Sequence, residues 1–426
     1  MKKFYLGVFV WLGLIQLTMA GGADEKLKYL REAPQIEAKE ENKNETTADD
    51  EPFKPSVNVG SIVHMFASAQ QSGFGVGATS YDNGSNGWGT GFSLYRARIL
   101  VGGQLSENGS FFLETELPTI VGGLKNDSTK NIKVAQIILD AQYEHQLGGG
   151  HMIVAGKQLV SHNRNGLQGA ASLMANDFTF FQYPYNLFEG QPLENNFGRD
   201  LGVNVRGFFL DDQLEYRVGL FTGRRAFASG KTTPRIVGRL AYNFFDAEKD
   251  YYYAGTKLGA GKTAALAIGA DVQGTYYNIG GDFFLDMPAG EAGSVTLNTA
   301  FTYMTGGTDL ENDYSFASMI PAQTVEFLEL GYYFKSAKIQ PWIRYERQNM
   351  SSKPEQIGDF ASTSDFDDFN STTIFGGGIN YFYNGYGSNI RLSYTSSTRK
   401  GFNTDTGMTE DGTYGQIWLQ LQFFVF

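Results

Sequence analysis

Arginine and carboxylate residues recur in this sequence at a spacing of two, which places them on one face of an extended strand. In residues 95–101, Tyr95, Ala97, Ile99 and Val101 share one face, while Arg96 and Arg98 share the other. A planar guanidinium can donate two parallel hydrogen bonds to a phosphate or carboxylate, so a row of arginines can bind oxyanions and pass them along. The candidate anion-binding residues are Arg96, Arg98, Arg206, Arg217, Arg239 and Arg344.

Acidic residues lie in the same phase as these arginines. They are Glu114, Glu116, Asp140, Glu144, Glu215 and Glu346. Buried charges are normally paired, so these carboxylates can form ion pairs with the arginines and stiffen a wall. The residues alone leave both roles open, an anion path or a network of ion pairs in the wall.

One long stretch without strand alternation, residues 159–199, carries further candidates. Lys157 stands at its entrance, and Arg164 and Arg199 lie within it among many aromatic residues. Long segments of this kind are usually functional or disordered, and the aromatic density favours a packed insert. We predict that this loop folds into a pore and narrows it. The alternative is an external cap that packs on neighbouring loops.

Other chemistry has weak support in the sequence. The absence of cysteine excludes disulfides, zinc–thiolate sites and a thiol nucleophile, and no serine has convincing histidine and acid partners. The acidic clusters at 309–313 and 365–368 lack the spaced glycine and terminal glutamate of a calcium-binding loop. With a formal net charge of −11, a strongly basic surface for nucleic acid is absent. We expect no enzyme activity, no cofactor, no metal and no nucleic-acid partner.

The candidates lie on segments that alternate apolar and polar residues over roughly eight to thirteen positions, long enough to cross a bilayer as a tilted strand. About sixteen such segments occur, approximately at 57–70, 92–105, 110–117, 134–145, 151–158, 200–209, 214–222, 235–245, 263–273, 276–286, 294–304, 324–335, 339–348, 373–383, 389–397 and 414–426. One apolar and one polar face suit a barrel with lipid outside and water inside. We predict an all-β fold, a transmembrane antiparallel β-barrel of about 16 strands with short periplasmic turns and long extracellular loops.

Two details disturb this pattern. Residues 246–262 are too long for a periplasmic turn, and the link near Gly274 is too short for an outer loop, so either a hairpin is misplaced there or the barrel is irregular. In the last strand, Phe424 and Phe426 fall on the face of the glutamines. Either the final residues lie beyond the polar lumen, or a bulge shifts the phase.

The N-terminal residues have the features of a secretory signal. Lys2 and Lys3 precede a mostly apolar run at 4–17, and small residues follow at 18–20, which predicts a signal peptide at 1–20. Residues 21–56 are charged, poor in strand-forming residues and interrupted by prolines, so we predict a flexible or partly helical periplasmic segment. The barrel then occupies 57–426, in the outer membrane of a Gram-negative-type bacterium.

Several stretches resemble the phosphate-selective porin O and P family. They are GFSLYRARILVGGQLSENGSFFLETEL at 91–117, GRDLGVNVRGFFLDDQLEYRVGLFTGRR at 198–225, GRLAYNFF from Gly238 and IGGDFFLD from Ile279. The second stretch is the most specific, and the similarity is spread over roughly residues 57–426. Tyr95 stands where this family often carries another basic residue.

The resemblance implies a sixteen-stranded, trimeric outer-membrane porin that passes small anions, with phosphate as the first guess. Its surroundings would be outer-membrane lipid and lipopolysaccharide. Because the family contains channels of unknown cargo, other solutes such as carboxylates, sugars or hydrocarbons stay open. A structural or adhesive barrel without transport also stays open.

Overall fold

The computed structural model describes residues 53–71, 87–117, 119–121, 131–133, 138–182, 198–223, 233–305, 322–350, 371–403 and 408–426. The predicted signal peptide, nearly all of 21–56 and the two acidic loop clusters lie outside these residues. The unit Phe53–Phe424 contains the barrel. No helix among the described residues is long and apolar enough to span a membrane.

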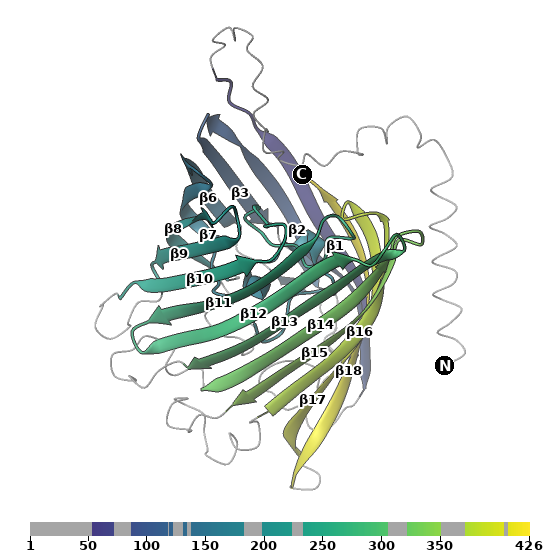
Figure 1. The fold of residues 1–426 in the computed structure, drawn as a ribbon. Helices are drawn as coiled ribbons and strands as arrows, with labels where there is room; N and C mark the ends of the chain where they lie inside the picture. The colour runs from purple at the N-terminus through teal and green to yellow at the C-terminus, as the bar shows by residue number, and fades with distance from the viewer. Residues whose placement is uncertain are drawn as a thin grey trace. The chain divides into compact units, whose positions relative to one another are not determined.

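The described residues form an almost purely β structure (Figure 1). The strands are β1 (Asn58–Gln71), β2 (Trp88–Ser106), β3 (Gly109–Glu116), β4 (Thr119–Val121), β5 (Asn131–Lys133), β6 (Ile138–Gly148), β7 (His151–Leu159), β8 (Arg199–Phe209), β9 (Leu214–Phe221), β10 (Arg235–Asn243), β11 (Thr263–Gln273), β12 (Tyr276–Pro288), β13 (Gly293–Thr305), β14 (Gln323–Phe334), β15 (Ile339–Met350), β16 (Ser371–Asn384), β17 (Ser388–Asn403) and β18 (Met408–Val425). Two 3₁₀ helices, η2 (Arg164–Leu167) and η3 (Ala170–Ser172), interrupt the pattern.

The strands pair with their neighbours in antiparallel register, and β18 pairs with β1 to close the sheet. Of the 18 described strands, β4 and β5 are three-residue pieces that pair with each other beyond β3, and the other 16 strands form the wall of the barrel. The prediction of a closed antiparallel barrel of about 16 strands is therefore confirmed. A lipid face and a water face impose the same alternation on every strand, which is why the sequence pattern is so regular.

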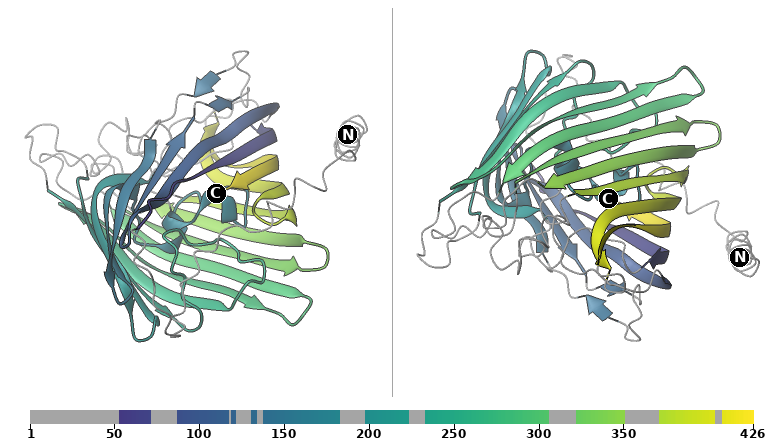
Figure 2. Two further views of the ribbon diagram at one scale, coloured as in Figure 1. Left: turned by 90° about the horizontal axis from the view of Figure 1, so that it is seen from above. Right: turned by 90° about the horizontal axis from the view of Figure 1, so that it is seen from below.

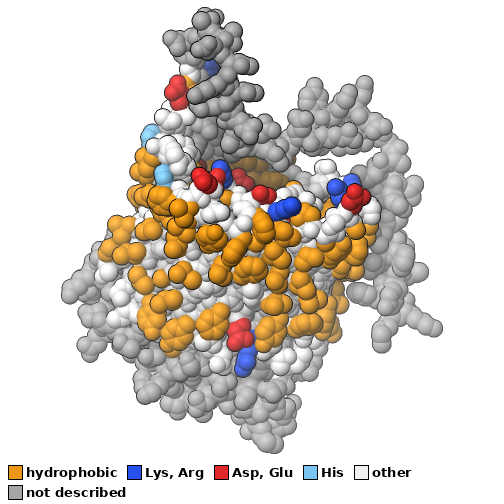
Figure 3. All heavy atoms as spheres, in the orientation of Figure 1, with side chains coloured by type: hydrophobic (Ala, Val, Ile, Leu, Met, Phe, Trp, Pro, Cys, Tyr) orange, Lys and Arg blue, Asp and Glu red, His pale blue; other side chains and the backbone are white. Residues whose placement is uncertain are grey.

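Strand β13 illustrates how the two faces differ. Its inward residues include Ser294, Thr296 and Asn298, each fully buried, whereas Phe301 on the outward face is 51% exposed. The same outward phase carries an apolar belt, of which Figure 3 shows one side. Its exposed members include Leu201, Val203, Val218, Leu220, Ile236, Leu240, Leu266, Ile268, Ile279, Ile343, Ile379 and Leu392. Such a belt is stable only against hydrocarbon, so the barrel spans a membrane.

The connections alternate in length as predicted, with two exceptions. Short turns join most strand pairs at one end, for example 149–150 and 335–338. At that same end β10 and β11 are joined by residues 244–262, whereas Gly274 and Thr275 alone join β11 and β12 at the opposite end. The hairpins lie where the sequence pattern predicts them. Of the two alternatives, the barrel is therefore locally irregular at these two connections.

Tyr95 departs from its predicted face, whereas Phe424 keeps the face that the sequence indicates. The register of β1 with β2 shifts at Tyr95, so its hydroxyl turns inward and donates a 2.5 Å hydrogen bond to Asp177, although alternation placed it on the lipid face. In β18 the register with β17 is unbroken, and Phe424 keeps the inward phase of Gln422. Phe424 packs on an apolar cluster inside the barrel, so the inward face is locally apolar there.

Candidate functional site in the barrel interior

Two segments enter the barrel from opposite ends. The long-loop insert, residues 160–182, is the described part of the connection from β7 to β8 and lies within the ring of strands (Figure 2). The turn insert, residues 244–262, is the long connection from β10 to β11 at the short-turn end. Together they place backbone and side chains where an open barrel would hold water.

The two inserts pair with each other. Gln168 and Tyr253 form a parallel β-bridge, in which Tyr253 N–H donates to the Leu167 carbonyl at 2.9 Å and Gly169 N–H to the Tyr253 carbonyl at 3.0 Å. Around this bridge lies a buried apolar cluster of Ile62, Leu159, Leu167, Ala170, Leu173, Phe178 and Tyr253. The interior therefore has a small hydrophobic core of its own.

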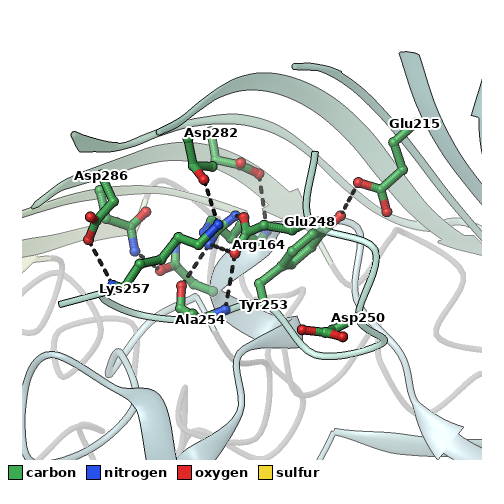
Figure 4. A network of polar contacts seen from close by, with 12 residues as sticks. Arg164, Glu215, Glu248, Asp250, Tyr253, Ala254, Lys257, Asp282 and Asp286 are labelled. Carbon is green, nitrogen blue, oxygen red and sulfur yellow. Dashed lines mark hydrogen bonds and ion pairs between the residues drawn. The ribbon is translucent and has the colours of Figure 1, made fainter. Parts of the chain in front are cut away.

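Arg164 is the main polar link between the inserts (Figure 4). It is 1% exposed, and its Nη1 and Nη2 atoms donate to the two carboxylate oxygens of Glu248 at 2.5 and 3.0 Å. Nη2 also donates to the Ala254 carbonyl at 2.6 Å, and the Arg164 backbone N–H donates to Asp282 at 3.1 Å. A bidentate pair in a buried setting fixes both inserts in one orientation.

Three of the predicted arginines lie side by side. Arg206 in β8 is opposite Arg217 in β9, which is opposite Arg239 in β10. All three are buried. Glu215 accepts from Arg217 at 2.7 Å and lies 3.9 Å from Arg206, while Asp282 pairs with Arg239. We call these three side chains the arginine row.

A second group of predicted residues, from β2, β3, β6 and β8, forms a compact network along the neighbouring part of the wall. Arg98 pairs with Glu114 at 2.8 Å and with Glu116 at 2.5 Å. Arg199 pairs with Glu114 at 3.0 Å and with Asp140 at 2.9 Å. All five side chains are buried, so this group has the ion-pair geometry of a wall network.

The remaining predicted arginines hold the long-loop insert. Arg96 donates to Asp177 at 2.5 Å. Arg344 pairs with Glu329 at 2.8 Å and donates to the carbonyls of Asp177 and Phe178 at 3.0 and 3.1 Å. Burial alone would raise the pKa of Asp177, but the charge of Arg96 and the hydrogen bonds to its carboxylate hold that pKa below its usual value.

The last predicted residues have local partners. Glu346 accepts two backbone N–H groups of the long-loop insert at 2.8 and 3.3 Å. Glu144 accepts from the side chain of Gln142 at 2.7 Å, and Lys157 donates to the Ile138 carbonyl at 2.7 Å. These contacts place Glu346 at the long-loop insert, while Glu144 and Lys157 make these hydrogen bonds with residues of the wall.

Two residues that bind partners in the barrel interior, Arg391 and Asp282, are absent from the candidates predicted from the sequence. Arg391 is fully buried and donates to the carbonyls of Leu173 and Ala175 at 2.7 and 2.9 Å. Its alternation with Asn389 and Ser393 along β17 was a usable signal. Asp282 lies in the same phase of β12 as other inward residues, but nothing in the sequence marks it as the partner of an arginine two strands away.

His162 supplies a test of how firmly the long-loop insert is held. It is 3% exposed, and burial lowers its pKa to about 4, against an ordinary value near 6.5. The released insert therefore binds a proton more readily than the packed one, so stability falls as the pH drops below 6.5 and rises again with pH. We expect His162 to contribute a loss of about 2 kcal/mol between pH 7.5 and 5, measured by urea unfolding in detergent as the difference between the wild type and His162→Asn.

The variant His162→Asn should lack this contribution, so its stability should fall less than that of the wild type between these pH values. His145→Asn, on the outward face of β6, is the matched control and should behave as the wild type. The same pH dependence in the wild type and in His162→Asn would contradict the assignment to His162.

Comparison with solved structures identifies the architecture. The outer-membrane porin OmpF of Salmonella typhi, solved with daunomycin, superposes with a TM-score of 0.51 at 12% identity, over 87% of this chain and 97% of that one. This chain has the outer-membrane porin fold. The outer-membrane channel DcaP of Acinetobacter baumannii aligns at 11% identity over 87% of this chain and 99% of that one, with a TM-score of 0.49. No protein-family model and no curated protein matches the sequence.

The porin fold and the apolar belt together place the protein in the outer membrane of a Gram-negative-type bacterium. The expected porin architecture is confirmed at this level. The narrower resemblance to phosphate-selective porins, and the anion-binding role of the arginines, stay predictions.

Proposed function

We propose that the protein is an outer-membrane porin that passes small anions, with phosphate as the first solute to test. The observation that carries this proposal is the arginine row, in which three guanidiniums lie in register on neighbouring strands of the inward face. Guanidiniums bind oxyanions through paired hydrogen bonds, and cations on a pore wall favour anions. The long-loop insert would narrow the path, as its sequence suggested.

We further propose that the chain works as a homotrimer surrounded by lipid and lipopolysaccharide, as the resemblance to phosphate-selective porins implies. The balance of charges limits how strong the anion preference can be. Each arginine of the row and of the wall network has an ion-pair partner among the described residues. Selectivity then depends on the local field at the narrowest point rather than on an excess of positive charge.

A barrel without transport is a second candidate, and the packing of the two inserts against each other favours it. The two functions differ in a direct measurement. A porin gives stable single-channel steps in a planar bilayer, whereas a plugged barrel gives none. A lipid-embedded enzyme would need a nucleophile with suitable partners at the lipid interface, and the sequence offers none.

The reversal potential in a salt gradient tests the anion claim. We expect anion preference for the wild type, and a reduced preference when Arg96→Ala and Arg98→Ala are combined. Arg347→Ala, on the outward face of β15, is the control and should leave the potential unchanged. An unchanged potential in the double variant would give both arginines a structural role, Arg98 in the wall network and Arg96 at the long-loop insert, and cation preference in the wild type would reject an anion channel.

A further inference from the structure

The arginine row is an unfavourable arrangement that needs an explanation. Arg206, Arg217 and Arg239 face one another across two strand pairs, and each is no more than 4% exposed. Like charges directly opposite each other destabilise a sheet. Places where a sequence breaks such a rule are commonly functional sites.

The arginine row has fewer carboxylate partners than guanidiniums. Two carboxylates, Glu215 and Asp282, make the ion pairs of three guanidiniums within the described structure. The other hydrogen-bond acceptors at Arg206 and Arg217 are neutral. They belong to the turn insert. Its carbonyl oxygens therefore accept the hydrogen bonds that a further anion would otherwise accept.

The acceptors from the turn insert are three consecutive backbone carbonyls. Arg206 donates to the carbonyls of Lys249 and Asp250 at 3.1 and 3.0 Å. Arg217 donates to the carbonyls of Tyr251 and Asp250 at 2.8 and 3.4 Å. The Asp250 carbonyl thus lies between two guanidiniums, as one oxygen of a bridging oxyanion would.

Aromatic rings cover the faces of the same guanidiniums. Tyr251 lies 5.6 and 5.7 Å from the guanidinium carbons of Arg206 and Arg217, and Tyr253 lies 4.4 and 5.3 Å from those of Arg217 and Arg239. Because the rings contact the faces, the N–H edges are the parts left to bind oxygen acceptors. This geometry suits a small group with several oxygens.

We propose that the arginine row is an oxyanion-binding site that the turn insert occupies as a built-in competitor. A free oxyanion carries full negative charge, whereas a carbonyl carries only a partial one, so charge-assisted hydrogen bonds favour the oxyanion. Binding of a small oxyanion displaces residues 249–251 from the row and moves the turn insert. This inference rests on the proposed function, because it assigns the anion site and its regulation within the same pore.

The turn insert is attached in a way that permits such movement. Asp246 and Lys262 close the β10–β11 hairpin at its base, where Asp246 N–H donates to the Lys262 carbonyl at 2.9 Å. Gly259 and Gly261 beside this base have positive φ values of 81° and 88°. The insert can therefore leave the row while β10 and β11 stay paired.

A thiol at position 256 reports the movement. The Thr256 side chain is fully buried and its hydroxyl lies 3.1 Å from that of Thr296 on β13. Since the chain has no cysteine, Thr256→Cys introduces a single thiol. In detergent-folded protein, a cationic methanethiosulfonate reagent reaches this thiol only when the turn insert leaves the wall. We measure its modification rate with inorganic phosphate and with sodium chloride of equal ionic strength.

We expect phosphate to raise the modification rate about fivefold or more over sodium chloride, the range of ordinary coupling between two sites. Adding Arg206→Gln and Arg217→Gln should abolish the phosphate response. Adding Arg235→Gln instead should preserve it, because Arg235 is a buried arginine of β10 that pairs with Asp271 and Asp200. Equal rates in both salts, or a phosphate response that survives loss of Arg206 and Arg217, would overturn the proposal.

A second measurement needs no substitution. Displacement should make the turn insert more susceptible to trypsin at Lys249 and Lys257, and phosphate should increase cleavage there in the unaltered chain. Unchanged cleavage would also count against displacement. The reversal potential separates this inference from the proposed function. A phosphate response with cation-selective current keeps the site and rejects the anion channel, whereas anion-selective current without a phosphate response keeps the channel and rejects the site.

Discussion

Replacing residues 247–261 with Gly-Glu-Ala should raise the single-channel conductance several-fold. These three residues, Gly290 to Ala292, lie between Ala289 and Gly293 in the turn from β12 to β13, where Ala289 N–H donates to the Gly293 carbonyl at 2.8 Å and closes the turn. Asp246 and Lys262 close the β10–β11 hairpin in a similar way, so the shorter turn fits. The deletion removes the bridge to Gln168 and opens the interior from the short-turn end.

The measurement is conductance in planar bilayers, with folding checked by heat-modifiable gel mobility. Lys249→Ala is the control, because the Lys249 side chain is 58% exposed and pairs with Asp212 outside the interior. This control should conduct as the wild type does. A deletion variant that folds and shows no gain in conductance would mean that the current-limiting point lies elsewhere, which would leave the turn insert with a structural role.

Replacing Arg391 with methionine should be the most destabilising single substitution considered. The guanidinium donates to carbonyls of the long-loop insert and to Gln422 at 3.2 Å, and it is fully buried. Methionine fills the space but leaves those carbonyls without a donor. Each orphaned buried acceptor costs about 1–3 kcal/mol, so we expect a loss of about 3 kcal/mol or more.

Urea unfolding in detergent, followed by tryptophan fluorescence, measures this loss. Lys335→Met, in the exposed turn between β14 and β15, is the matched control and should change the stability little. The stability of Arg391→Lys should lie between the stabilities of these two variants. An ammonium keeps the charge but cannot donate to all the carbonyls that the planar guanidinium reaches. A stability of Arg391→Met equal to that of the control would show that these hydrogen bonds do not hold the insert.

The barrel could be predicted from the sequence because the membrane imposes a local rule. Each strand must turn apolar residues to lipid and polar residues inward, and alternation reports this without knowledge of any distant contact. Tyr95 is an exception to this alternation, because one register shift turns its side chain to the other face of the sheet. No neighbouring residue indicates this shift in the sequence. The unusual length of 246–262 was visible, but not the place to which it folds.

The interior could be predicted only in part. Alternation identified which arginines face inward, and Arg391 could have been included by the same reasoning. The partners of these arginines were harder to predict, because many are backbone carbonyls of the inserts. The Lys249 carbonyl that accepts from Arg206 is an example. A carbonyl has no signature in the sequence, and its position depends on packing between segments far apart in the chain.

The bridge between Gln168 and Tyr253 also dictates an order of assembly. Its two residues belong to inserts that enter from opposite ends of the barrel, so the long loop must cross the bilayer before the bridge can form. The hairpins of the wall have no such requirement, since their partners are neighbours in sequence. We therefore expect the bridge to form only after the β7–β8 and β10–β11 hairpins have inserted, with the two inserts still apart until then.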